Sequence, residues 1–123
     1  MQNSEVYRRG FVVPLSEEAE QALMINDVAY DTAVEFCEIP NQETFEELHF
    51  IGVFNVINSN LNVSLDDYEE DIVEEAQVSL LKELVERLKD FPGISLQASG
   101  AVDGLIRLCN VALKHKSPVF FIL

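Results

Sequence analysis

The sequence predicts a mainly α-helical fold: a single compact domain over residues 1–123 with four to five helices, and an option for short strands at the two termini. A chain of 123 residues with 48% hydrophobic residues can bury one core without metal ions or disulfides. Apolar residues recur at helical spacing over most of the chain, and Ser, Asn and Thr stand where helices would begin. An α+β fold with residues 48–57 as a strand is the alternative.

The N-terminal third is expected to begin extended and to continue as a helix. Residues 6–14 are rich in Val, Phe and Tyr, which favours a short strand or an extended lead-in. Ser16 then precedes three glutamates, and a capping residue followed by acids is typical of a helix start. Apolar residues recur at roughly helical spacing over residues 19–37, so the predicted helix extends to there with an interruption near residue 26.

The apolar segment 48–57 fits either a helix or a strand. As a helix it is apolar around most of its circumference, which is typical of a central buried helix, and as a strand it is a buried apolar run. We favour the helix, because Asn41 and Thr44 are both suitable caps and Thr44 and Glu47 have the spacing of a capping box. The sequence Asn-Ser-Asn-Leu-Asn at 58–62 then predicts a loop.

The clearest helical pattern covers residues 65–89. Ser64 is a suitable cap, apolar residues follow at helical spacing, and Phe-Pro-Gly at 91–93 stops the pattern. A last helix is expected from near Ala101 to Lys116. The tail Ser-Pro-Val-Phe-Phe-Ile-Leu is too hydrophobic to remain in water, so it should pack as a strand or an anchoring segment that can pair with the N-terminal segment.

The charges of the chain are strongly segregated. The net charge is −14, from 22 acidic and 8 basic residues, and between Gly10 and Leu81 there are 17 acids but no lysine or arginine. Such a chain would be repelled by nucleic acids and by anionic membranes, so we expect neither as a partner. It would attract a basic protein and speed the encounter.

The densest acidic stretch reads SLDDYEEDIVEE at residues 64–75, where seven of the ten residues from Asp66 to Glu75 are acidic. On the predicted helix these acids fill one half of the circumference, and acids at i and i+4 repel by a few tenths of a kcal/mol per pair. Stabilisation of the helix N-terminus and general solubility are the simpler explanations. Because a solubility surface mixes both signs, we instead interpret this face as a docking surface for a basic partner.

No motif in the sequence names a reaction, a metal ion or a cofactor, so the sequence predicts a protein that is not an enzyme. His49 follows Glu46 at i+3, but the second such pair that a di-iron site needs is missing. Cys37 and Cys109 are expected to be two reduced core thiols, with a disulfide or redox pair as the alternative. Neither a secretory signal nor an apolar membrane span is recognisable, which favours a cytoplasmic protein.

These observations favour an acidic protein-binding inhibitor, most simply a bacterial immunity or antitoxin-type protein that docks on a basic toxin or nuclease and blocks its active site. The chain is similar in size, charge and lack of catalytic motifs to small acidic nuclease inhibitors, whose carboxylates take the positions of substrate phosphates. A regulatory adaptor or complex subunit with incidental acidity is one alternative. An enzyme with an unrecognised site is another, and strongly shifted carboxylate pKa values in a pocket would favour it.

The predicted partner-binding residues are the acids of the stretch, a tyrosine at its edge as an aromatic anchor, and three further glutamates if the two predicted helices lie side by side. They are Asp66, Asp67, Tyr68, Glu69, Glu70, Asp71, Glu74, Glu75, Glu43, Glu46 and Glu47.

Overall fold

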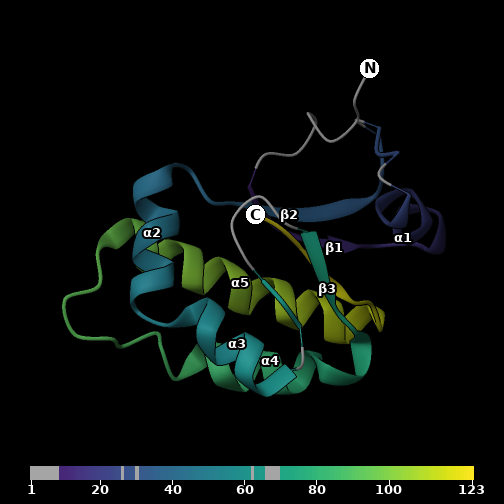
Figure 1. Ribbon diagram of the computed structural model, residues 1–123. Coiled ribbons are helices and arrows are strands. Elements are labelled where there is room, and N and C mark those ends of the chain that lie inside the picture. The colour runs from purple at the N-terminus through teal and green to yellow at the C-terminus, as the bar shows by residue number, and fades with distance from the viewer. Residues whose placement is uncertain (1–8, 26, 30, 62, 66–69) are drawn as a thin grey trace.

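The protein has an α+β fold, not the mainly α fold that the sequence predicted. The computed structural model describes residues 9–25, 27–29, 31–61, 63–65 and 70–123. These residues form five α-helices and a four-stranded antiparallel sheet (Figure 1). The strand on which the α+β alternative depended is also wrong, because residues 48–57 lie in two helices and the turn between them.

The two ends of the described chain meet in the centre of the sheet. The strand order is β2 (Val34–Glu38), β1 (Gly10–Pro14), β4 (Val119–Ile122) and β3 (Glu70–Val73), and all neighbours are antiparallel. Phe11 of β1 lies opposite Phe121 of β4. The expected pairing of the N-terminal segment with the apolar tail is therefore confirmed.

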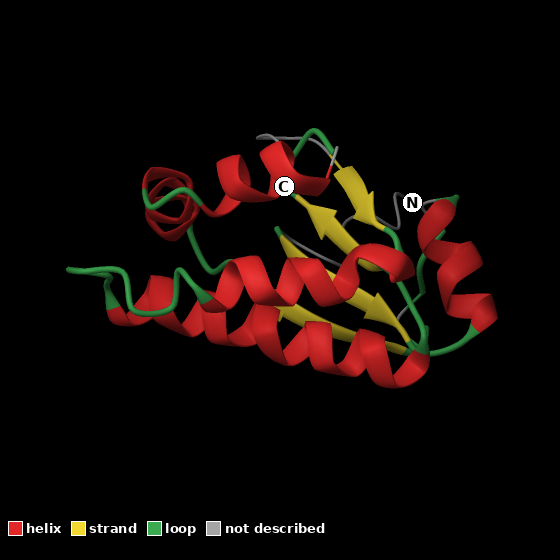
Figure 2. Cartoon of the chain, turned by 90° about the horizontal axis from the view of Figure 1, so that it is seen from below, coloured by secondary structure: helices red, strands yellow, loops and turns green. Residues whose placement is uncertain are grey.

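Helices pack on both faces of the sheet, most of them on one face. They are α1 (Glu17–Met24), α2 (Gln42–Phe50), α3 (Val53–Leu61), α4 (Val78–Glu86) and α5 (Leu96–His115). α5 packs against β1 and β2, α4 runs beside α5, and α1 and α2 lie at opposite ends of the molecule (Figure 2). Among the described residues, no helix combines the length and the hydrophobicity that crossing a membrane requires.

The main core lies between the sheet and the helices. Phe11 and Phe121 face this core and are almost fully buried there with Leu105 of α5. On the opposite face of the sheet Phe120 packs with Leu23 of α1 in a smaller apolar cluster. Successive residues of a strand point to opposite faces, so a strand that is covered on both faces is apolar throughout. This explains the continuous apolar run of β4.

The acidic stretch does not begin a long helix, as the sequence predicted for residues 65–89. Its residues Glu70–Val73 form β3, a 3₁₀ turn follows at Glu75–Gln77, and α4 begins only at Val78. Residues 66–69 of the expected helix lie outside the described residues. Pairing with β4 provides backbone hydrogen bonds for β3 without placing acids at i and i+4 along one helix face, where they would repel.

Three further boundaries differ from the prediction. Residues 34–37, expected at the end of the first helix, belong to β2, where alternate residues face the core and the opposite side. Residues 58–61, expected as a loop, complete α3, while residue 62 lies outside the described part. The last helix begins at Leu96 rather than near Ala101, because a serine cap directly precedes it.

The helix favoured for residues 48–57 is confirmed, although it is broken into two pieces. Gly52 separates α2 from α3 with a φ of +95°, a backbone conformation that side chains other than hydrogen disfavour. In α3 the side chain of Asn58 accepts the N–H of Leu65 at 2.7 Å and donates to its carbonyl at 2.9 Å. The asparagine therefore holds the following loop instead of forming part of it.

Capping side chains fix the first residues of three helices. Ser16 and Ser95 each accept a backbone N–H three residues further on at 3.1 Å, as expected for an N-cap. Of the two caps considered for α2, Asn41 is the one used, and it accepts the N–H of Thr44 at 2.8 Å. The expected capping box of Thr44 with Glu47 is not formed, which leaves the Glu47 carboxylate free to bind elsewhere.

Candidate partner-binding surface

The predicted partner-binding acids fall into two separate regions. Glu43, Glu46 and Glu47 lie on α2, whereas Glu74 and Glu75 lie where β3 leads into α4. Figure 1 shows α2 and this connection on opposite sides of the molecule. The condition that two helices lie side by side is not met, so the glutamates of α2 do not extend the surface of the acidic stretch.

The structure describes the side chains of three acids of the stretch. Asp71 is half-buried and accepts the N–H groups of Ser64 and Ile72, both at 2.8 Å. Glu74 and Glu75 are exposed. The side chain of Glu70, together with Asp66, Asp67, Tyr68 and Glu69, lies outside the described residues, and the binding role of these residues stays a prediction.

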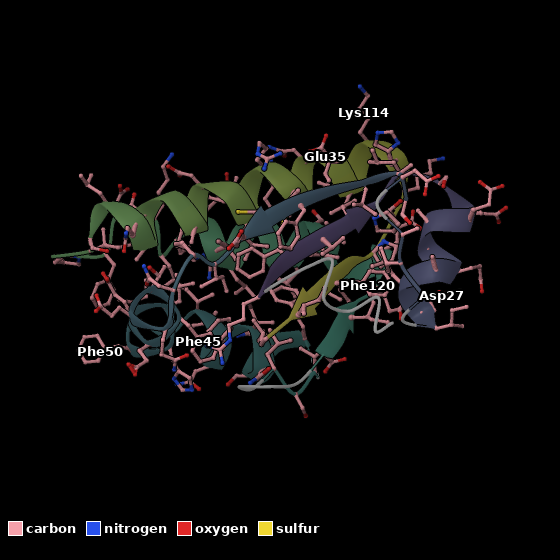
Figure 3. The ribbon with its side chains drawn as sticks, turned by 90° about the horizontal axis from the view of Figure 1, so that it is seen from above. Asp27, Glu35, Phe45, Phe50, Lys114 and Phe120 are labelled. Atoms are coloured by element: carbon pink, nitrogen blue, oxygen red, sulfur yellow. The ribbon has the colours of Figure 1, made fainter. Side chains whose placement is uncertain are left out.

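α2 presents two carboxylates and an aromatic ring on one outer stripe. Phe45 and Leu48 are buried beneath the helix, while Glu43 and Glu46 are exposed and Phe50 is 82% exposed. Residues 43, 46 and 50 are spaced i, i+3 and i+7, so they lie along the same side of a helix. Figure 3 shows Phe50 at the outer edge of the molecule, pointing away from the sheet.

A carboxylate bridge joins α2 to the beginning of α5. Glu47 accepts the backbone N–H of Ser95 at 2.7 Å and its hydroxyl at 2.6 Å. These two donors lower the pKa of the Glu47 carboxyl below its ordinary value, because they stabilise its charged form. Leu96, the next residue, is 93% exposed. Glu47 therefore has a structural role and is not an open binding group.

Phe50 and Leu96 were not among the contact residues predicted from the sequence. Phe50 was counted among the apolar residues of a buried helix, and Leu96 lies before the expected start of the last helix. A signal was present in each case: Phe50 shares its helical stripe with Glu43 and Glu46, and Leu96 follows Ser95, a capping residue type.

Replacing Glu47 by glutamine should destabilise the protein near neutral pH and have little effect in strong acid. The folded-state pKa lies below the ordinary value of 4.5, so the carboxylate contributes stability above that pH. This contribution is lost as the pH falls through the folded-state pKa. Urea unfolding of both proteins at a series of pH values would measure the difference. Glu46→Gln, in the same helix, is the control, and a difference for Glu47→Gln that is constant with pH would contradict the expectation.

The acids of α1 and α2 have no ion-pair partner among the described residues. The three ion pairs found there are Glu35–Arg107 at 3.4 Å, Glu83–Arg87 at 3.8 Å and Asp103–Lys89 at 3.7 Å. All three involve cations of α5 or of the residues just after α4, and their side chains are between 45% and 71% exposed. Arg9 also contacts α2, where it donates to Gln42 at 2.6 Å and lies over the ring of Phe45. The exposed acids of α1 and α2 nevertheless form no ion pair within the described part of the chain.

A second acidic surface borders α1. An open hollow of about 540 Å³ lies beside this helix. Its lining residues are Glu17, Glu18, Gln21, Ala22, Ile25 and Asp27. Ile25 is 68% exposed, so apolar and acidic groups also adjoin here. This region provides a comparison for the surface of α2.

Groups that could carry out chemistry are few in the described ranges. No three His, Cys, Asp or Glu side chains there gather as ligands for a metal ion. Cys37 and Cys109 are both free thiols, as expected, although Cys37 is only half-buried. Burial raises the pKa of Cys109 to about 12 and that of Cys37 above its ordinary value. Both thiols are therefore poor nucleophiles near neutral pH.

The most complete candidate site is the end of the molecule where α2 meets the start of α5. It combines two exposed carboxylates with two exposed apolar side chains on helices that are bonded to each other. No protein-family model, curated protein or solved structure matches this chain, so the function is inferred from this geometry and from the charge.

Proposed function

We propose that this protein is an acidic protein-binding inhibitor of the immunity or antitoxin type, which docks on a basic protein and blocks its active site. A toxin that acts as a nuclease is the proposed class of partner. The observation that carries the proposal is the lack of any ion-pair partner for the acids of α1 and α2 among the described residues.

Exposed carboxylates that are not neutralised by an ion pair raise the attraction of a surface for a basic protein. A net charge of −14 also costs stability through self-repulsion, and a mixed surface would avoid much of that cost. On a nuclease, basic residues hold the phosphates of the substrate, and carboxylates can take those positions. Inhibition by charge mimicry therefore needs no catalytic group on this chain.

The proposed setting is the cytoplasm of a bacterium. Free thiols persist in a reducing compartment, and this protein has two. The proposed role also requires no cofactor and no enzymatic activity. A regulatory adaptor would share the same surface, and the fate of the partner's activity separates the two roles.

Co-expression with the products of neighbouring genes, one at a time, tests the proposal. We expect one basic protein to co-purify at low salt and to be released at high salt, because salt screens exposed charges. Adding this protein in stoichiometric amount should abolish the toxic or nucleolytic activity of the partner. A partner whose activity is unchanged in the complex would favour the adaptor, and a complex insensitive to salt would contradict electrostatic docking.

Replacing four exposed carboxylates by neutral amides should then slow formation of the complex with the basic partner. Changing Glu17, Glu18, Glu43 and Glu46 to glutamine removes four exposed charges that have no described ion-pair partner. We expect the association rate constant to fall by about tenfold at low salt, since steering depends on the local field.

The matched control variant changes the net charge by the same amount, but at positions outside α1 and α2. Its four substitutions are Glu83→Gln, Glu86→Gln, Asp90→Asn and Asp103→Asn, on α4, α5 and the segment between them. Stopped-flow association measures both variants. Equal slowing by both would show that only the net charge matters and that no acidic surface is used.

A further inference from the structure

Two large apolar side chains are exposed at the end of the molecule where α2 meets α5. Phe50 is 82% exposed and Leu96 is 93% exposed, more than any other exposed large hydrophobic side chain among the described residues. Single exposed apolar residues are common on protein surfaces. Here, however, both are close in sequence to one bonded pair, since Glu47 precedes Phe50 by one helical turn and Ser95 directly precedes Leu96.

The core does not account for Phe50. The buried side of this region is already filled by Phe45 and Phe54, whose ring centroids are 5.2 Å apart. The ring of His49 meets Phe45 and Phe54 edge-on at 6.4 Å and 5.9 Å. Phe50 takes no part in this cluster, so its ring is left for contacts outside the domain. Aromatic side chains are enriched among interface residues that contribute most to binding.

The position of Phe50 is held by several bonds. Besides the link of Glu47 to Ser95, the side-chain amide of Asn41, which caps α2, donates to the side-chain oxygen of Gln97 at 3.4 Å. α2 and the first turn of α5 are therefore fixed to each other. A surface that is already ordered loses little conformational freedom on binding, which favours affinity.

The charge beside these apolar groups defines the kind of partner. Glu43 and Glu46 are exposed on the same stripe of α2 as Phe50. Nucleic acids and anionic membranes would be repelled there, and so would a second copy of a chain with a net charge of −14. A cationic segment with an apolar side would complement both the carboxylates and the exposed apolar side chains.

We infer that Phe50 and Leu96, with Glu43 and Glu46 beside them, form the docking surface for a cationic amphipathic helix of the partner protein. Apolar side chains of that helix pack on Phe50 and Leu96, and its lysines or arginines face the two carboxylates. The inference rests on the proposed function, because the same surface would then be where the basic partner is bound. Unlike the charge of the chain, it identifies the two apolar residues, Phe50 and Leu96, that the partner would contact.

Two synthetic peptides test the inference on the full chain. One is an amphipathic helix of lysine and leucine, and the other has serine in place of leucine, with the same length and charge. We expect the lysine–leucine peptide to bind at least about fivefold more tightly, because apolar burial adds to charge attraction. Its amide chemical-shift changes in ¹⁵N-labelled protein should centre on Phe50 and Leu96.

Serine substitutions then test the anchors. The double variant Phe50→Ser and Leu96→Ser should bind the lysine–leucine peptide no better than the lysine–serine peptide. The matched control, Ile25→Ser with Leu80→Ser, replaces two other exposed apolar residues and should keep the preference. Circular dichroism of both variants would establish that the fold is retained.

The possible failures separate this inference from the proposed function. Equal, salt-sensitive binding of the two peptides, or shift changes centred on Ile25, would overturn the docking surface and leave the proposed function standing. If neither peptide binds even at low salt, the docking surface is overturned, whereas the proposed function is overturned only if co-expression also yields no basic partner.

Discussion

Replacing Phe121 by alanine should lower the free energy of unfolding by about 3–5 kcal/mol. Phe121 lies in β4, a strand flanked on both sides, and its side chain is fully buried. Its ring meets that of Phe11 edge-on, with centroids 5.3 Å apart. The substitution removes this aromatic contact and the apolar burial of the ring, and leaves a cavity that the surrounding sheet and helix can fill only in part.

Urea unfolding followed by circular dichroism measures the effect of this substitution. The control is Leu113→Ala on α5, where the side chain is 40% exposed and the loss should stay below about 1 kcal/mol. A similarly small loss for Phe121→Ala would contradict the central position of β4. Because domains of this size are stable by only about 5–15 kcal/mol, the variant should also unfold at a clearly lower temperature.

Gly104→Ala should destabilise the protein, although alanine favours helices. Gly104 lies within α5 where this helix crosses β2, and an added Cβ would lie 2.2 Å from Sγ of Cys37. The higher helix propensity of alanine would add up to about 1 kcal/mol, whereas overpacking costs about 1–3 kcal/mol. We expect the clash to prevail, because Cys37 is held in the sheet opposite Phe11.

Two further variants isolate the cause. Gly100, also in α5, has nothing within 4 Å of an added Cβ, so Gly100→Ala should stabilise by about 0.5–1 kcal/mol. Combining Gly104→Ala with Cys37→Ala removes the sulfur and should recover most of the loss. A double variant that is no more stable than Gly104→Ala alone would show that the close approach to Cys37 is not the cause.

The sequence was most informative where local chemistry and tertiary structure agree. Ser16 caps α1 as expected, and the last predicted helix forms over almost all of its expected length. The apolar tail had to be buried in any fold, and the pairing of β1 with β4 achieves this. In these cases a side-chain hydrogen bond or a long apolar pattern determines the local structure almost independently of the rest of the fold.

The candidate surface was predictable only in part. Glu43 and Glu46 were chosen for their charge, and both are exposed. The exposure of Phe50 was missed, because a segment that is apolar around most of a helix gives no indication of which side faces water. The break at Gly52 turns the chain and leaves Phe50 outside the core.

What the sequence by itself determined is the segregation of charge and the amount of apolar surface that must be buried. Only the tertiary structure decided that residues 70–73 of the acidic stretch form a strand, because β4 is apolar on both faces and exposes backbone groups that a neighbouring strand must pair. A four-residue strand next to a helix is short enough for either periodicity to fit its apolar residues. The hydrogen bonds from β4, which is distant in sequence, stabilise the strand over the helix.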